Sequence, residues 1–153
     1  MSPTKPATVP EPALSPYLIV RGATEAILFY ARAFGASEQF RLCEPSGKVG
    51  HAELLIGGSR FMLADEYPDF GALAPTTIGG SPVSIHLYVE DVDHTYSRAV
   101  AAGATALRSV QDEFYGDRTG MLLDPFGHKW HLATRKEEVT PAEMQRRMDA
   151  AYA

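Results

Sequence analysis

The chain contains an internal repeat, which limits the folds that it can adopt. The segments VRGATEAILFYARAFGA (20–36) and VEDVDHTYSRAVAAGA (89–104) each begin at the end of an apolar run, continue as a helix and close on Gly-Ala. Further along, RFMLA (60–64) corresponds to KWHLA (129–133), and Val89 follows Val20 by the same number of residues as Lys129 follows Arg60. A register held over a whole module is typical of a duplicated structural unit. The chain is therefore predicted to contain two copies of one module.

Each copy has the pattern of one helix and four strands. Apolar residues recur at helical spacing from Ala23 to Phe34, the second helix is expected from Val92 to Ala102, and a glycine follows each. Short apolar or alternating runs separated by turn residues predict strands at 16–20, 38–44, 50–56, 60–64, 84–90, 105–110, 118–124 and 129–134. The predicted fold class is α+β: one domain (15–135) of two tandem βαβββ modules, 15–66 and 83–135, joined by a linker at 67–82.

Both ends of the chain differ from the modules. The proline-rich segment 1–14 predicts a flexible N-terminal arm. At the other end, segment 136–153 predicts a C-terminal helix that starts at a capping box, Thr140-Pro141-Ala142-Glu143. Met144, Met148 and Tyr152 form one apolar stripe on it, which we expect to dock on its own domain or on a partner subunit.

Composition excludes several classes of protein. A length of 153 residues fits one domain, and a net charge of −5 argues against a general nucleic-acid binder. The single cysteine, Cys43, rules out an internal disulfide and is expected to be an ordinary strand residue. No apolar run is long enough for a membrane span, and the first residues lack the apolar core of a secretory signal. The expected location is the cytoplasm, with no membrane partner.

The chain resembles the vicinal oxygen chelate superfamily, which includes glyoxalase I, extradiol dioxygenases and the fosfomycin- and bleomycin-resistance proteins. The closest resemblance is to its PhnB-like branch. The resemblance is carried by PYLIV, AILFYARAFGA, HAELLIG, HLYVEDVD, RAVAAGA, FYGDRTG and DPFGHKWHLA, which together span nearly the whole of 15–135. It implies paired modules whose sheets curl into open cups, a small-molecule ligand between two sheets, and a homodimer.

The resemblance also implies where a metal would bind, and here the chain departs from the pattern. Metal-dependent members take ligands from the first and last strand of each module. The matching positions are Ser15 (or Pro16 if the register slips), Met62, Ser84 and His131. Serine and methionine are poor ligands for a hard or borderline divalent ion. We therefore expect no metal cofactor and no glyoxalase I activity.

An alternative metal set can be built from the alternation of side chains along the strands. His51 and Glu53 share a face of one strand, and His86 and His131 lie on polar faces of two others. If these faces line one cup, the four side chains would suit Zn²⁺ or Fe²⁺. Otherwise they form a polar pocket that hydrogen-bonds an organic ligand.

Three further residues are candidates for ligand contact. Arg118 is expected either to clamp an anionic group or to pair with Asp117 or Asp124. Tyr115 could stack on a ligand, and Trp130 could either do so or belong to the core. The turn that starts at Asp124 is expected to be structural, with the aspartate accepting turn amides.

The predicted function is binding of a small organic molecule, preferably anionic or phenolic, in a sequestering or carrier role. The alternatives are a metal-dependent lyase or dioxygenase with the rearranged His/Glu set, and an interaction protein with a vestigial cup. The predicted ligand-binding residues are His51, Glu53, Ser84, His86, Tyr115, Arg118, Trp130 and His131.

Overall fold

The computed structural model describes residues 3–153, and its first module is the predicted βαβββ unit. Its sheet has the strand order β1-β4-β3-β2, with β1 parallel to β4 and the other pairs antiparallel. The helix ends at Gly35, which takes the left-handed conformation (φ 70°) that favours glycine. The elements are β1 (Tyr17–Val20), α1 (Ala23–Phe34), β2 (Ser37–Cys43), β3 (Val49–Ile56) and β4 (Ser59–Asp65).

The second module repeats this topology. Its sheet has the order β5-β8-β7-β6, and again the first strand pairs in parallel with the last. Its elements are β5 (Ser84–Tyr88), α3 (Val92–Ala102), β6 (Thr105–Asp112), β7 (Asp117–Leu123) and β8 (Lys129–Arg135). The predicted α+β class and tandem modules are confirmed.

The repeat extends to the residues that fix the start of each helix. The Asp65 carboxylate, at the end of β4, accepts hydrogen bonds from the backbone N–H groups of Gly22 and Ala23. At the equivalent place on β8, the Thr134 hydroxyl accepts one from the N–H of Val92. Each side chain satisfies an N–H group that the first turn of a helix leaves free. The last strand of each module thus positions the helix of the same module.

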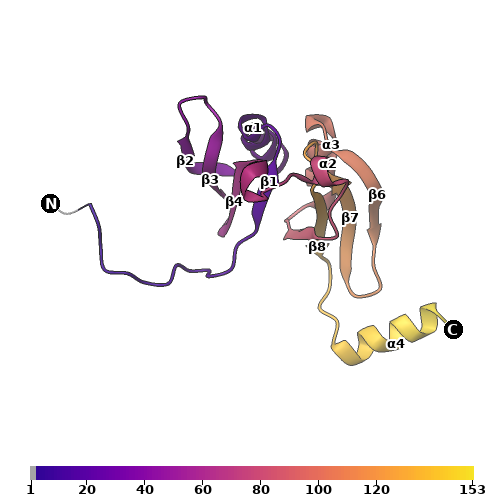
Figure 1. The fold of residues 1–153 in the computed structure, drawn as a ribbon. Coiled ribbons are helices and arrows are strands. Elements are labelled where there is room, and N and C mark those ends of the chain that lie inside the picture. The colour runs from indigo at the N-terminus through magenta and orange to yellow at the C-terminus, as the bar shows by residue number, and fades with distance from the viewer. Residues whose placement is uncertain (1–2) are drawn as a thin grey trace.

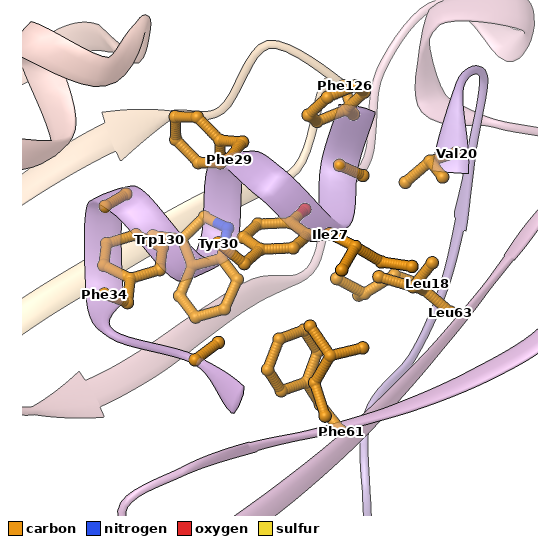
Figure 2. Close-up of a cluster of buried hydrophobic side chains, with 14 of the residues drawn as sticks. Leu18, Val20, Ile27, Phe29, Tyr30, Phe34, Phe61, Leu63, Phe126 and Trp130 are labelled. Atoms are coloured by element: carbon orange, nitrogen blue, oxygen red, sulfur yellow. The ribbon is translucent and has the colours of Figure 1, made fainter. Parts of the chain in front are cut away.

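The two helices pack against each other between the two sheets, so both modules share one core (Figure 1). Aromatic rings dominate this core: Tyr30 and Phe34 of α1 contact Trp130 of β8, and Phe61 of β4 lies edge-on to both Tyr30 and Trp130 (Figure 2). Each sheet therefore turns one face to the helices and the other, its outer face, away from the shared core.

The linker is more ordered than its composition predicts. It holds a 3-10 turn, η1 (Pro68–Phe70), and a short helix, α2 (Pro75–Ile78), and a proline at the start of each supplies a φ suited to a helical turn. Ala74 and Pro75 are buried. Arg60 of β4 ties down the N-terminal arm by donating to the Ser15 hydroxyl and the Pro12 carbonyl. Residues 1 and 2 of the predicted flexible arm lie outside the described residues.

The C-terminal helix α4 (Pro141–Ala151) begins where the capping box predicts, and the Thr140 hydroxyl accepts a hydrogen bond from the N–H of Glu143. It projects from the body of the molecule beside the second sheet, and it buries none of its residues (Figure 1). Arg147 attaches it by donating to the Phe114 carbonyl and to Glu137. Across residues 3–153, no helix has the length and apolarity needed to cross a bilayer.

Candidate functional site

Several polar side chains of the second module lie on the outer face of its sheet. Trp130 and Leu132 of β8 point to the core, so His131 between them points outward. Register places His86 of β5 opposite His131 and Met121 of β7 beside it. The β-strand alternation then brings Tyr88, Asp117, Thr119 and Arg135 to the same outer face.

A pocket of about 540 Å³ opens on this face. Its floor is the sheet, and its wall is the β6–β7 loop together with the segment that leads into α4. Aromatic rings and carboxylates both contribute. The lining residues are His86, Tyr88, Tyr115, Asp117, His131, Arg135, Glu137, Glu138, Val139 and Met144. This volume is in the range of small-molecule sites.

A hydrogen-bonded network borders the pocket and centres on Arg108 of β6. Its guanidinium donates to Glu113, to the Thr119 hydroxyl at 3.1 Å and to His131 Nε2 at 3.4 Å. Glu113 Oε1 also accepts from Thr119 and Gln111. Burial acts to raise the pKa of Glu113, but the hydrogen bonds from these three residues outweigh it and lower the pKa below its usual value. Glu113 is therefore a fixed carboxylate that holds Arg108 in place.

His86 and His131 lie side by side, with ring centroids 5.0 Å apart. Burial, followed by the proximity of His86 and Arg108, lowers the pKa of His131. His131 is thus held in its neutral form at pH 7, with Nε2 accepting from Arg108.

A second network lies at the mouth of the pocket. The Tyr88 hydroxyl donates to Asp117 Oδ2 at 2.7 Å and accepts from Arg135 at 2.8 Å, and the Arg135 guanidinium lies 5.1 Å from the centre of the Tyr88 ring. Asp117 is almost fully buried, whereas the Arg135 side chain is 55% exposed. Burial, followed by the charge of Glu113, raises the pKa of nearby Tyr115, which keeps its hydroxyl protonated.

Of the residues predicted from sequence, His86, Tyr115 and His131 line this pocket. Ser84 lies two residues before His86 on β5, on the same face, but it is exposed and pairs with Lys129 beyond the pocket. The sequence left open whether Trp130 stacks on a ligand or belongs to the core, and the structure places it in the core. Its ring is 1% exposed, and its Nε1 donates to Asp124.

Arg118 is not available for a ligand in this pocket. It follows Asp117 on β7 and therefore points to the opposite face of the sheet. There it forms ion pairs with Asp93 of α3 at 2.8 Å and with Asp112 at 3.2 Å. The hydrogen bonds that Arg118 donates to these carboxylates raise its pKa above its usual value. Neither partner was among the two that the sequence suggested: Asp112 lies opposite Arg118 across the β6–β7 pair, and Asp93 comes from α3.

His51 and Glu53 belong to the other sheet. They lie on its outer face, on β3, where His51 Nδ1 forms a 2.7 Å hydrogen bond with the Tyr17 hydroxyl and its ring contacts Phe40. The shared core separates this face from that of His86 and His131. The four side chains therefore do not converge within one chain, and their convergence in one cup stays a prediction that requires a second copy. Within residues 3–153, no group of three or more His, Cys, Asp or Glu side chains is arranged to hold a metal ion.

The metal positions implied by the resemblance also fit a metal poorly. Ser15 accepts a hydrogen bond from Arg60, Met62 offers a thioether, and Ser84 is an exposed hydroxyl. His131, the one competent ligand, directs Nε2 at the guanidinium of Arg108. A cation beside the ligating nitrogen opposes a second cation there.

Sequence reasoning missed Tyr88, Arg108, Glu113, Asp117 and Arg135 as site residues. Register shifts on both sides of Arg108 interrupt the pairing of β6 with β7, so simple alternation does not show its direction. Arg135 does follow the alternation of His131 along β8, and it could have been found that way.

Comparison with known proteins agrees with this architecture. The family model described as "Glyoxalase/Bleomycin resistance protein/Dioxygenase superfamily" matches residues 13–132. An uncharacterised Mycobacterium bovis protein, Mb0911c, is 46% identical, and the match covers 92% of this chain and 94% of that protein.

Two solved structures extend the comparison. The At5g48480 gene product of Arabidopsis thaliana is 29% identical, with a TM-score of 0.64 over 78% of this chain and 96% of that one. A Bacillus cereus PhnB protein, named as a putative 3-demethylubiquinone-9 3-methyltransferase, has a TM-score of 0.62 over 79% and 98%. At 21% identity it supports the fold alone.

Proposed function

Because the chain belongs to the glyoxalase/bleomycin resistance protein/dioxygenase superfamily, we propose that it binds a small organic molecule in the pocket on the outer face of the second sheet. Binding requires no metal ion, and the protein sequesters or carries its ligand rather than transforming it. The site comprises His86, Tyr88, Tyr115, Asp117 and His131.

The observation that carries this proposal is the contact between Arg108 and His131. His131 is the one residue with a competent side chain at the metal-ligand positions that the resemblance implies. Its contact with Arg108 makes it part of the hydrogen-bonded wall of the pocket. Buried polar groups cost free energy unless they are paired, and here Arg108, Glu113 and Thr119 pair with one another. The network needs no ion to complete it, while the rings beside it offer contact area to an organic molecule.

We further propose that the protein works as a homodimer. The outer face of the first sheet exposes Tyr17, Phe40 and Leu42, which are 47%, 45% and 60% exposed. A second copy that set this face against the second sheet would cover these side chains and close the pocket. His51 and Glu53 would then enter the site from the partner.

The closeness of His86 and His131 favours a second candidate, a metal-dependent lyase or dioxygenase. Two imidazoles with a partner's carboxylate would match a common zinc or iron ligand set. Elemental analysis of untagged protein purified without chelators separates the candidates. One Zn, Ni or Fe per chain that disappears in the double variant His86→Ala/His131→Ala would replace the binding proposal with the enzyme.

A thermal-shift screen against small aromatic acids, amines and neutral compounds tests binding itself. We expect a stabilising compound whose effect is lost in His86→Ala. His94→Ala is the matched control, because His94 is exposed on α3 away from the pocket. Stabilisation that survives His86→Ala unchanged would place the ligand elsewhere.

A further inference from the structure

The charged side chains that line the pocket indicate which class of ligand the pocket can bind. Three carboxylates line it, Asp117, Glu137 and Glu138, against the single guanidinium of Arg135. Asp117 pairs with Arg135, and Glu137 pairs with Arg147 of α4. Glu138 has no ion-pair partner in the described part of the chain. After internal pairing, the lining therefore retains a negative charge and no unpaired lysine or arginine.

The wall of the pocket is suited to a cation in a second way. Tyr88, Tyr115 and His86 present rings, and Met144 adds a polarizable thioether. The faces of aromatic rings attract cations, and this attraction strengthens when both groups lose water. His131 does not supply an opposing charge at the centre of the face, since burial and its neighbours lower its pKa and keep it neutral.

The protein already holds a cation of its own in this position. The guanidinium of Arg135 lies over the Tyr88 ring and reaches Asp117, so ring and carboxylate together form a place for a positive group. Asp117 is buried, but the Arg135 side chain is more than half exposed, so its guanidinium can return to water when it leaves this carboxylate. A ligand cation that replaces Arg135 on the ring and the carboxylate would keep Asp117 paired.

We propose that the ligand is an organic cation: a protonated or quaternary amine that lies on Tyr88 and Tyr115 near Asp117 and Glu138, joined to an apolar body that contacts Met144. The inference rests on the proposed binding function and reverses the anionic preference drawn from Arg118. That arginine lies on the other face of the sheet, so it cannot select an anion here.

Titration calorimetry with three probes of similar size tests the charge class: benzyltrimethylammonium, 3-phenylpropionate and 4-phenyl-2-butanol. We expect the cation to bind most tightly and to lose affinity at high salt. Glu138→Gln should weaken it by up to about 5-fold, the range for an exposed charge pair. The matched control is Glu25→Gln, which removes the same charge from an exposed position on α1 and should change nothing.

Arg135→Gln separates the two charge classes best, because it should raise the affinity for a cation and lower the affinity for an anion. Freeing the Tyr88 ring and Asp117 should tighten binding of the cation about 2- to 5-fold, the range for an exposed cation–π contact. An anion that used Arg135 would bind more weakly. Tighter binding of 3-phenylpropionate than of the cation, with loss on Arg135→Gln, would overturn the cation proposal and leave small-molecule binding intact. If none of the three probes binds, and no compound in the thermal-shift screen stabilises the protein, both proposals fail.

Discussion

The Tyr30 hydroxyl donates a 2.5 Å hydrogen bond to Asp124 Oδ2 and so joins the helix of one module to the turn of the other. Both groups are buried. The same carboxylate accepts from Trp130 Nε1 and from the backbone N–H groups of Phe126 and His128. Burial, followed by the charge of Asp124, raises the pKa of Tyr30 well above its usual value, so the hydroxyl remains a donor. Asp124 thus forms a buried polar contact between the two modules.

Removing this hydroxyl should destabilise the fold without touching the pocket. We expect Tyr30→Phe to lower the free energy of unfolding by about 1–3 kcal/mol, because Asp124 loses one partner in a buried place. Urea denaturation followed by circular dichroism measures the change. Tyr152→Phe is the control, since Tyr152 is 82% exposed and should be neutral. Equal stability of the two variants would show that the modules do not depend on this bond.

Gly120 of β7 should not tolerate a side chain. A Cβ atom there would lie 2.8 Å from the ring of Tyr96 and 3.0 Å from Val110, so α3 could not keep its position on the sheet. We expect Gly120→Ala to cost about 1–3 kcal/mol, as overpacking of cores usually does. Gly58→Ala is the matched change at a position with open space around it and should leave the melting temperature nearly unchanged. A melting temperature for Gly120→Ala as high as that of Gly58→Ala would argue against the tight packing.

Much of the fold could be predicted from the sequence because its signals are local. The apolar spacing of α1 and the glycine after it determine the helix bounds, which match the prediction to the residue. The same holds for the start of α4 at its capping box. Because the sequence repeats, the second module could be predicted from the first. The prediction that Asp124 accepts hydrogen bonds from turn amides is also confirmed.

The site could be predicted only in part, because its composition depends on how the modules pack. Alternation along β5 and β8 correctly placed His86 and His131 on one face. The alternation does not reveal that α1 packs on α3. Because of this packing, the sheet faces that carry Glu53 and His131 lie on opposite sides of one core. Nor does the alternation reveal the irregular β6 that brings Arg108 to the pocket.

The lowered pKa of His131 predicts a specific dependence of stability on pH. A base whose folded-state pKa lies below its unfolded value, about 6.5, binds a proton more readily in the unfolded chain. Its stabilising contribution is complete above that pH and decreases as the pH falls towards the folded-state pKa. We therefore expect the melting temperature of the wild type to decrease more between pH 7.5 and pH 5.5 than that of His131→Gln. His94→Gln, altered at an exposed histidine, should follow the wild type, and parallel curves for all three proteins would contradict the assignment.

The exposed side chains of the first sheet predict the outcome of a sedimentation experiment. If a second copy covers the outer face that carries Phe40 and Leu42, the protein should sediment as a dimer at about ten micromolar, since apolar surface of this kind favours association. Leu42→Lys should shift it towards monomer while circular dichroism stays unchanged, because a charge would have to be buried in the interface. Leu28→Lys makes the same substitution at an exposed leucine on α1 and should remain dimeric. A wild-type monomer, or a dimer indifferent to Leu42→Lys, would mean that the partner does not lie on this face.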